Sequence, residues 1–89
     1  MRAIIRQTQF KTDVKRIARS GRYKSADLLA VVEDLANDRP LAKKHRDHTL
    51  SGHWQDYREC HIKPDWLLIY KLEPERLVLV RTGSHSDLF

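Results

Sequence analysis

The hydrophobic period of the chain changes once, near Pro40, and this change limits the folds that are open to it. Before Pro40 the apolar residues recur at helical spacing, whereas after residue 53 they alternate or form short continuous runs, as in strands. Helices followed by strands are typical of the α+β class. The 89 residues suffice for one domain, so we expect residues 1–89 to fold as a single unit.

The part of the chain before Pro40 predicts a short strand and two amphipathic helices. The pair of isoleucines at residues 4–5 indicates the strand. Apolar positions at i, i+4, i+7 and i+8 form one stripe between Thr8 and Gly21, and a second stripe follows Ser25. Only a few residues join the two helices, which predicts an antiparallel helical hairpin.

Three strands are predicted after an aperiodic loop at residues 41–53. Residues 54–63 alternate, residues 66–70 form a more buried run, and residues 77–80 form the third strand. Turns that contain proline separate these strands. The predicted order is therefore β-α-α-β-β-β, with two N-terminal helices packed on an antiparallel sheet.

The chain carries 17 Lys or Arg and 12 Asp or Glu, a formal net charge of +5, and the excess lies in its first half. Residues 1–47 contain 12 basic and 6 acidic residues, whereas residues 48–89 contain 5 and 6. A polyanion is therefore the leading class of partner, because clustered cations bind phosphate backbones. The alternative is that these cations only solvate the helix faces. The clustered basic residues are Lys11, Lys15, Arg16, Arg19, Arg22, Lys24, Lys43, Lys44 and Arg46.

The sequence also excludes several classes of protein. No apolar run approaches the ~18 residues that would span a membrane, and the first ten residues lack the apolar segment of a signal peptide. The single cysteine, Cys60, cannot form an internal disulfide and suits a reducing compartment. We therefore expect a cytoplasmic protein that does not associate with membranes.

Side chains suited to acid–base chemistry gather in the second half of the chain. His61 and Asp65 flank one predicted hairpin turn, and His85 follows the last strand. His48 lies in the preceding loop, and Arg81 adds a planar cation that suits phosphate. RNA supplies its own nucleophile, the 2′-hydroxyl, so an enzyme needs only to remove that proton, stabilise the phosphate and protonate the leaving 5′-oxygen. These residues therefore suit metal-free cleavage of RNA.

Two other chemistries fit the sequence less well. The spacing of His45, His48 and His53 is not a standard metal-ligand pattern, so we predict neither a metal nor any other cofactor. A nucleophilic pair of Cys60 and a histidine is disfavoured, because strand alternation places Cys60 on the side opposite His61. We expect Cys60 to be a buried structural thiol.

Five short motifs stand in the second half of the chain: DHTLSG at residues 47–52, RECHI at 58–62, PDWLLIYK at 64–71, RTGSH at 81–85 and DLF at 87–89. Together they resemble the YafQ-type toxins of the RelE/ParE superfamily. The resemblance implies a RelE-like α+β fold and the toxin of a type II toxin–antitoxin pair. Such a toxin is a metal-independent endoribonuclease that cuts mRNA in the A site of the 70S ribosome and so inhibits translation. It is held inactive by a cognate antitoxin with a DNA-binding N-terminal domain.

The resemblance also implies roles for individual residues. His85 would be the general acid, and Asp65 and His61 would share the base and orienting roles. His48 would steady the phosphate or the base, and Phe89, expected to be an exposed aromatic side chain, would hold a nucleobase. From charge and resemblance together, the candidate substrate-binding residues are Arg81, Phe89, Lys43, Lys44 and Arg46.

Two alternative functions remain open at this point. A ParE-like gyrase poison would share the fold but carry no nuclease chemistry, and it would not need the four catalytic candidates together. A small basic module that binds RNA or DNA without cutting it would need only the positive charge.

Overall fold

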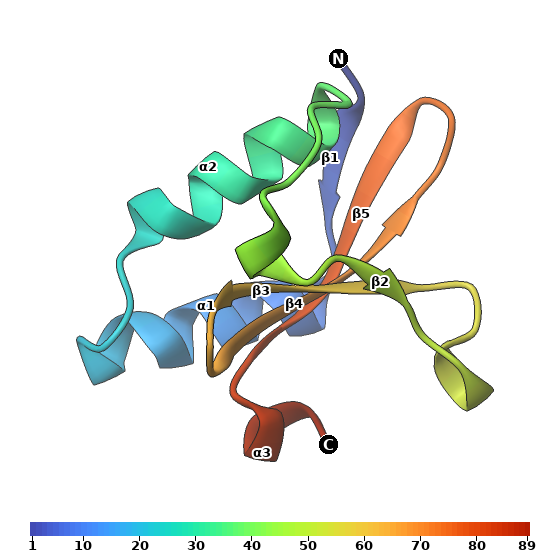
Figure 1. The fold of residues 1–89 in the computed structure, drawn as a ribbon. Helices are drawn as coiled ribbons and strands as arrows, with labels where there is room; N and C mark the ends of the chain where they lie inside the picture. Colours follow the sequence, from blue (N-terminus) through green and yellow to red (C-terminus); the bar gives the residue numbers. More distant parts are fainter.

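A five-stranded sheet forms the middle of the protein, and two helices cover one of its faces (Figure 1). The computed structural model describes residues 1–89. The strands are β1 (Ala3–Arg6), β2 (His48–Thr49), β3 (Arg58–Lys63), β4 (Trp66–Leu72) and β5 (Arg76–Gly83). The helices are α1 (Thr8–Ser20), α2 (Ser25–Ala36) and the short α3 (His85–Leu88), with 3-10 turns η1 at Lys43–His45 and η2 at Gly52–Trp54.

The sheet is mixed, with the strand order β1-β5-β4-β3-β2. Strands β3, β4 and β5 are antiparallel neighbours, as predicted, and β2 also runs antiparallel to β3. Strand β1, in contrast, runs parallel to β5 and pairs Ala3 with Arg76. The prediction of an entirely antiparallel sheet is therefore wrong at this edge. Its reason is connectivity: two helices and three strands separate β1 from β5 in the chain, so no hairpin turn dictates the direction of this pair.

Two segments predicted without regular structure contain short elements. The loop predicted at residues 41–53 includes η1, β2 and the first part of η2, and the residues after the last strand form α3. A two-residue strand and a four-residue helix are too short to give a periodic signal, so the sequence pattern did not indicate them.

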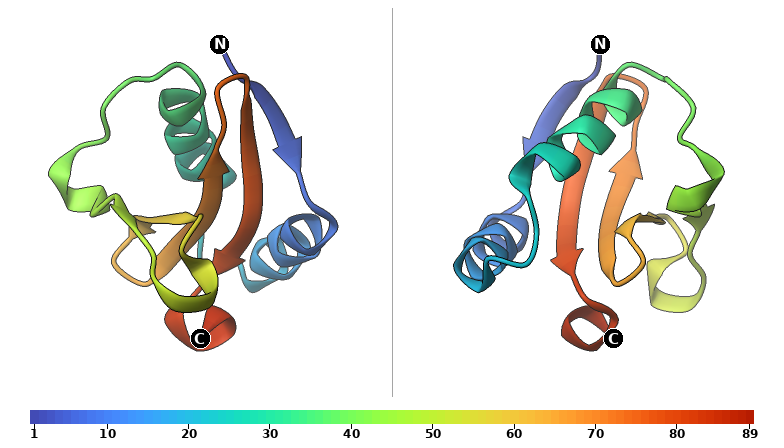
Figure 2. Two further views of the ribbon diagram at one scale, coloured as in Figure 1. Left: turned by 90° about the vertical axis from the view of Figure 1, so that its right-hand side faces the viewer. Right: turned by 60° about the vertical axis from the view of Figure 1, so that its left-hand side comes forward.

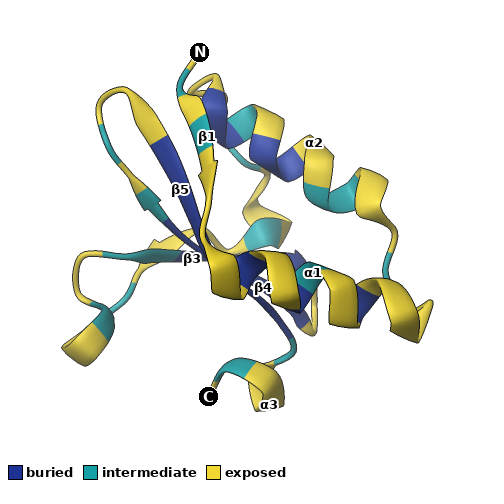
Figure 3. Ribbon diagram, turned by 180° about the vertical axis from the view of Figure 1, so that it is seen from behind, coloured by how far each residue is buried: buried dark blue, intermediate teal, exposed yellow.

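The main hydrophobic core lies between the two long helices and the sheet, as the helical stripes predicted. Figure 3 shows the buried positions of α1 and α2 on their inner sides and exposed positions on their outer sides. No helix of the protein combines the length and the apolar character needed to cross a membrane. The buried members of this core are Phe10, Ile17, Val31, Val32, Leu35, Ala36, Cys60, Ile62, Trp66, Leu68, Tyr70, Leu77 and Leu79.

A smaller set of side chains packs on the opposite face of the sheet. Ile69, Val78 and Val80 form a second buried cluster, against which the segment from Leu50 to Tyr57 and Leu88 of α3 pack. In Figure 2, α3 and the η2 segment both lie toward the lower end of the sheet. Strand alternation turns Glu59 and His61 away from the main core, because their neighbours Cys60 and Ile62 belong to it.

Candidate active site

The β3–β4 hairpin and α3 bring three of the catalytic candidates together. His61 lies near the end of β3, Asp65 lies in the following turn, and His85 is the first residue of α3. The ring centroids of His61 and His85 are 6.1 Å apart. The backbone N–H of His85 donates to Oδ1 of Asp65 at 3.3 Å. Asp65 therefore connects the hairpin turn to the helix that carries His85.

Glu59 stands between His48 and His61 and was not among the sequence candidates. Its Oε1 lies 3.7 Å from Nε2 of His48 and 3.5 Å from Nε2 of His61. The residue is only 4% exposed, so water contributes little to the stabilisation of its charge. Alternation along β3 had placed Glu59 and His61 on one side, but the sequence contained no indication that His48 would face both of them.

In both His48 and His61, a backbone carbonyl holds the Nδ1 atom of the ring. Nδ1 of His48 donates to the carbonyl of Arg46 at 2.6 Å, and Nδ1 of His61 donates to that of Pro64 at 3.3 Å. A carbonyl oxygen only accepts, so the Nδ1 atoms carry protons. In both rings Nε2 is therefore the atom that can exchange a proton, and both Nε2 atoms face Glu59.

A partly exposed polar cluster around Asp47 holds the segment of His48 in place. Asp47, the preceding residue, accepts a short hydrogen bond from the hydroxyl of Tyr70 and one of 3.3 Å from Nε of Arg58. Burial, followed by the neighbouring carboxylate, raises the pKa of Tyr70, so its hydroxyl stays protonated and donates. The β2–β3 pairing then sets His48 directly opposite Glu59.

Arg81 is held by a buried carboxylate of α1. Its Nε and Nη2 donate to Oδ2 and Oδ1 of Asp13 at 2.7 and 3.2 Å. Burial alone would raise the pKa of Asp13, but the hydrogen bonds from Arg81, from the backbone N–H of Thr82 and from Gln9 outweigh it, and the pKa is lowered. The Arg81 side chain keeps 24% of its surface exposed, so it can meet a ligand only with that part. Asp13 was not predicted, because a single acidic residue in a basic helix carries no distinctive signal.

Phe89 lies beside His85, and its side chain is open to solvent. The two ring centroids are 5.9 Å apart, and Phe89 is 59% exposed. An exposed phenylalanine next to a catalytic candidate can present its face to a nucleobase.

The basic segment Lys43, Lys44 and Arg46 is exposed on η1 and lies close to the site. Within it, Nδ1 of His45 donates to the backbone carbonyl of His61 at 2.7 Å. This hydrogen bond fastens η1 to β3, so the three cations stand next to the strand that carries His61 and Glu59.

The residues of metal-ligating type do not form a metal site. No three His, Cys, Asp or Glu side chains of the chain are arranged to hold a metal ion. Cys60 is fully buried, and burial raises its pKa to about 12, so it is a protonated structural thiol, as expected.

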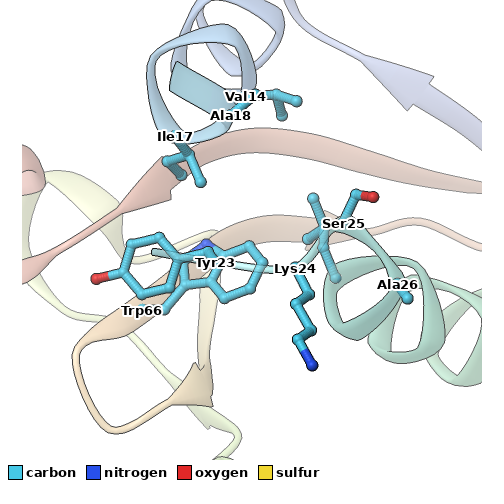
Figure 4. A pocket seen from close by; sticks show the side chains of 9 residues that line it. Val14, Ile17, Ala18, Tyr23, Lys24, Ser25, Ala26 and Trp66 are labelled. Carbon is cyan, nitrogen blue, oxygen red and sulfur yellow. The ribbon is translucent and has the colours of Figure 1, made fainter. Parts of the chain in front are cut away.

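An apolar hollow of about 460 Å³ opens between α1 and α2, behind the Asp65 turn (Figure 4). The rings of Tyr23 and Trp66 form one wall, with their centroids 4.6 Å apart. The hydroxyl of Tyr23 donates to the backbone carbonyl of Asp65 at 3.1 Å. The wall of the hollow is thus tied to the turn that supports His85.

Comparison with known proteins gives a family match over almost the whole chain. The model of the family described as "Bacterial toxin of type II toxin-antitoxin system, YafQ" matches residues 2–89. The mRNA interferase toxin YafQ of Escherichia coli strain K12 is 41% identical over 83 residues, which cover 91% of this chain and 88% of that protein.

Solved structures agree in fold as well as in sequence. The metal-bound toxin from Helicobacter pylori is 44% identical, with a TM-score of 0.93 and full coverage of both chains. The toxin-like chain in the E. coli DinJ-YafQ complex is 39% identical, with a TM-score of 0.88 over 100% of this chain and 99% of that one.

Proposed function

Since the chain belongs to the YafQ family of bacterial toxins of type II toxin–antitoxin systems, we propose that it is an endoribonuclease that cleaves mRNA. The name of the E. coli relative, mRNA interferase, supports the substrate, and the acid–base groups at one end of the sheet support the chemistry. The family match over residues 2–89 supports a single toxin domain.

The observation that carries the proposal is that His61 lies near both a buried carboxylate and a second imidazole. Its Nε2 is 3.5 Å from Oε1 of Glu59, and its ring centroid is 6.1 Å from that of His85. A phosphodiester over His61 would therefore meet a group that accepts a proton and another that donates one. Such pairs of groups are what cleavage by the 2′-hydroxyl requires.

We assign the steps as follows. His61, supported by Glu59, removes the proton of the 2′-hydroxyl, and the 2′-oxygen attacks phosphorus. The bond from phosphorus to the 5′-oxygen breaks, and His85 protonates that oxygen. The product carries a 2′,3′-cyclic phosphate. Asp65 orients His85 through its backbone N–H, and His48 holds Glu59 or the phosphate.

The surrounding residues would bind the substrate. The exposed part of Arg81 stabilises the charge that grows on the phosphate, and Phe89 stacks on a base. The cations of η1, Lys43 and Lys44 with the adjacent Arg46, contact the RNA backbone or ribosomal RNA.

The proposed steps use no metal ion. Two similar structures are described as copper-bound and metal-bound, but in this chain the His, Cys, Asp and Glu side chains do not come together in a group of three ligands. The mechanism is therefore written with side chains alone.

We further propose that the partners are the 70S ribosome with its mRNA and a cognate antitoxin, and that the protein acts in the cytoplasm. The structure of a relative bound to DinJ supports an antitoxin partner. Placement of the mRNA in the ribosomal A site would supply the substrate geometry that a small, open site does not impose by itself.

The test measures cleavage of short mRNAs that place each sense codon in the A site of purified 70S ribosomes. We expect the protein to cut such mRNAs, with and without EDTA, and to leave a 2′,3′-cyclic phosphate. His85→Ala should abolish cleavage, because no other group can protonate the leaving oxygen. His53→Ala is the matched control: His53 is exposed on η2 and makes no hydrogen bond or ion pair.

Three results would contradict the proposal. They are cleavage that requires a divalent metal, full activity of His85→Ala, and growth arrest through failure of replication instead of translation. The last result would indicate a gyrase poison.

A further inference from the structure

On the edge of β5 that faces β1, the hydrogen-bond partner changes from a strand to a side chain where β1 ends. The last pair of the β1–β5 register is Arg6 with Leu79. Three residues further along β5, the backbone N–H of Thr82 donates to Oδ2 of Asp13 at 3.1 Å. Asp13 is fully buried, so its carboxylate replaces β1 as the partner of this part of β5.

Arg16 lies one turn after Asp13 and touches three elements at once. Its Nη1 is 3.0 Å from Oδ1 of Asp13 in α1. Its Nη2 donates to the carbonyl of Thr82 in β5 at 3.3 Å and lies 3.6 Å from Oδ2 of Asp87 in α3. A single guanidinium therefore connects α1, the end of β5 and the helix that begins with His85.

The position of Gly83 shows how closely the side chains of Arg16 and Asp87 pack against the backbone. A Cβ at position 83 would lie 2.8 Å from Nη2 of Arg16 and 3.0 Å from the Asp87 side chain. Gly83 also has a φ of +156°, at which other residues are strained. The path of the backbone from β5 into α3 is therefore shaped around the ion pair of Arg16 and Asp87.

The short helix α3 needs such external support. With four residues it cannot form a stable helix alone. Ser84 and Asp87 cap it reciprocally, since the Ser84 side chain accepts from the Asp87 backbone and the Asp87 side chain accepts from the Ser84 backbone. This capping box fixes the form of α3 but not its place relative to β5.

We propose that Arg16 is a positioning residue, which uses its contacts with Asp13 and Asp87 to fix α3, and with it the imidazole of His85, against the end of β5. The inference rests on the proposed ribonuclease function, in which His85 donates the proton. Arg16 is 43% exposed and Asp87 39% exposed, so their ion pair adds little to global stability. Its effect should therefore be on the placement of His85 and not on the melting temperature.

The test is a double-mutant cycle of Arg16→Gln and Asp87→Asn. Glutamine removes the charge at position 16, and asparagine keeps a side-chain oxygen that can accept from the Ser84 N–H. Each single variant should lower kcat for mRNA cleavage on programmed ribosomes by roughly five- to tenfold, because a small displacement of a catalytic group is costly. KM and Tm should stay near the wild-type values, and the double variant should be no slower than either single one.

Arg6→Gln is the control, since Arg6 is an exposed cation of β1 without an ion-pair partner and lies outside the clustered basic residues. Its kcat should equal that of the wild type. The inference is overturned if the two effects multiply in the double variant or if kcat does not change. It is also overturned if Arg16→Gln alone raises KM, because that result would make Arg16 an RNA contact.

A second measurement decides the inference independently of catalysis. The NMR signals of the His85 ring should shift in both single variants and remain unchanged in Arg6→Gln. Unchanged His85 signals in Arg16→Gln would refute the positioning role even if the enzyme is active. Absence of ribonuclease activity in the wild type would refute the proposed function and leave the NMR result to decide the placement.

Discussion

Nε2 of His61 lies 3.5 Å from Oε1 of Glu59, a carboxylate that the fold has almost removed from water. A charge in such a place needs a partner, and the imidazoles at positions 48 and 61 are its only ionic partners. In the proposed mechanism Glu59 and His61 therefore form one acid–base unit, in which the carboxylate supports the proton that the ring takes up.

Glu59→Gln should reduce cleavage strongly without unfolding the protein. The amide keeps the shape of the side chain but cannot stabilise a proton on His61, so we expect the single-turnover rate to fall about 100-fold. Glu75→Gln, at an exposed carboxylate in the β4–β5 turn, is the control and should cleave normally. Equal rates for the two variants would remove Glu59 from the mechanism.

Asp13 should make the protein sensitive to acid. Its folded-state pKa is lowered below the ordinary 3.8, so it contributes stability above that value that is lost as the pH falls through the folded pKa. The free energy of unfolding should therefore decrease as the pH falls below about 4. Asp13→Asn should flatten this decrease and cost roughly 3–5 kcal/mol at pH 7, because Arg81 loses its buried partner. Urea unfolding at several pH values measures both, and parallel pH curves for the two proteins would contradict the prediction.

Tyr70→Phe should loosen the segment that carries His48. The variant leaves Asp47 without its hydroxyl donor in a half-buried place, at a cost of about 1–2 kcal/mol in the free energy of unfolding. Hydrogen exchange should become faster in the backbone of β2. Tyr57→Phe serves as the control, since the Tyr57 hydroxyl makes no hydrogen bond within the protein. If exchange in β2 is unchanged, the cluster does not position His48.

Phe89→Ala should weaken substrate binding without affecting the fold. Loss of stacking on a base is worth about 1–3 kcal/mol, so KM should rise roughly 5- to 100-fold while Tm stays constant. Leu29→Ala removes an equally exposed apolar side chain from α2 and should leave KM unchanged. An unaltered KM in Phe89→Ala would show that the ring does not contact RNA.

The basic segment of η1 should govern the salt dependence of binding. Replacement of Lys43, Lys44 and Arg46 by Glu should weaken association with 70S ribosomes and reduce the slope of log K against log salt. Filter binding at 50 to 200 mM salt, roughly the range over which counterion release is visible, measures that slope. The same slope in the variant and in the wild type would show that this segment is not part of the contact.

The sequence was informative where its signal was periodic or local. The stripes of α1 and α2 and the alternation of β3 predicted the core, and the alternation also placed Cys60 away from His61. His61, Asp65 and His85 could be expected near one another because, in a meander, the turn between the first two strands and the end of the third strand lie at the same end of the sheet.

What the sequence missed depends on contacts between distant segments. The parallel pairing of β1 with β5 and the bond of Asp13 to Arg81 join the two ends of the chain, and no local pattern encodes such partners. Glu59 was missed for a related reason. Its role appears only when the loop residue His48 is seen opposite it.

The β1–β5 pairing also constrains how the protein is made. Ala3 pairs with Arg76, so β1 has no partner strand, and Asp13 has none of its partners in β5, until β5 has been synthesised. Contacts of such long sequence separation form late and slowly. The proposed cleavage site therefore cannot assemble before β5 has left the ribosome on which the chain is made.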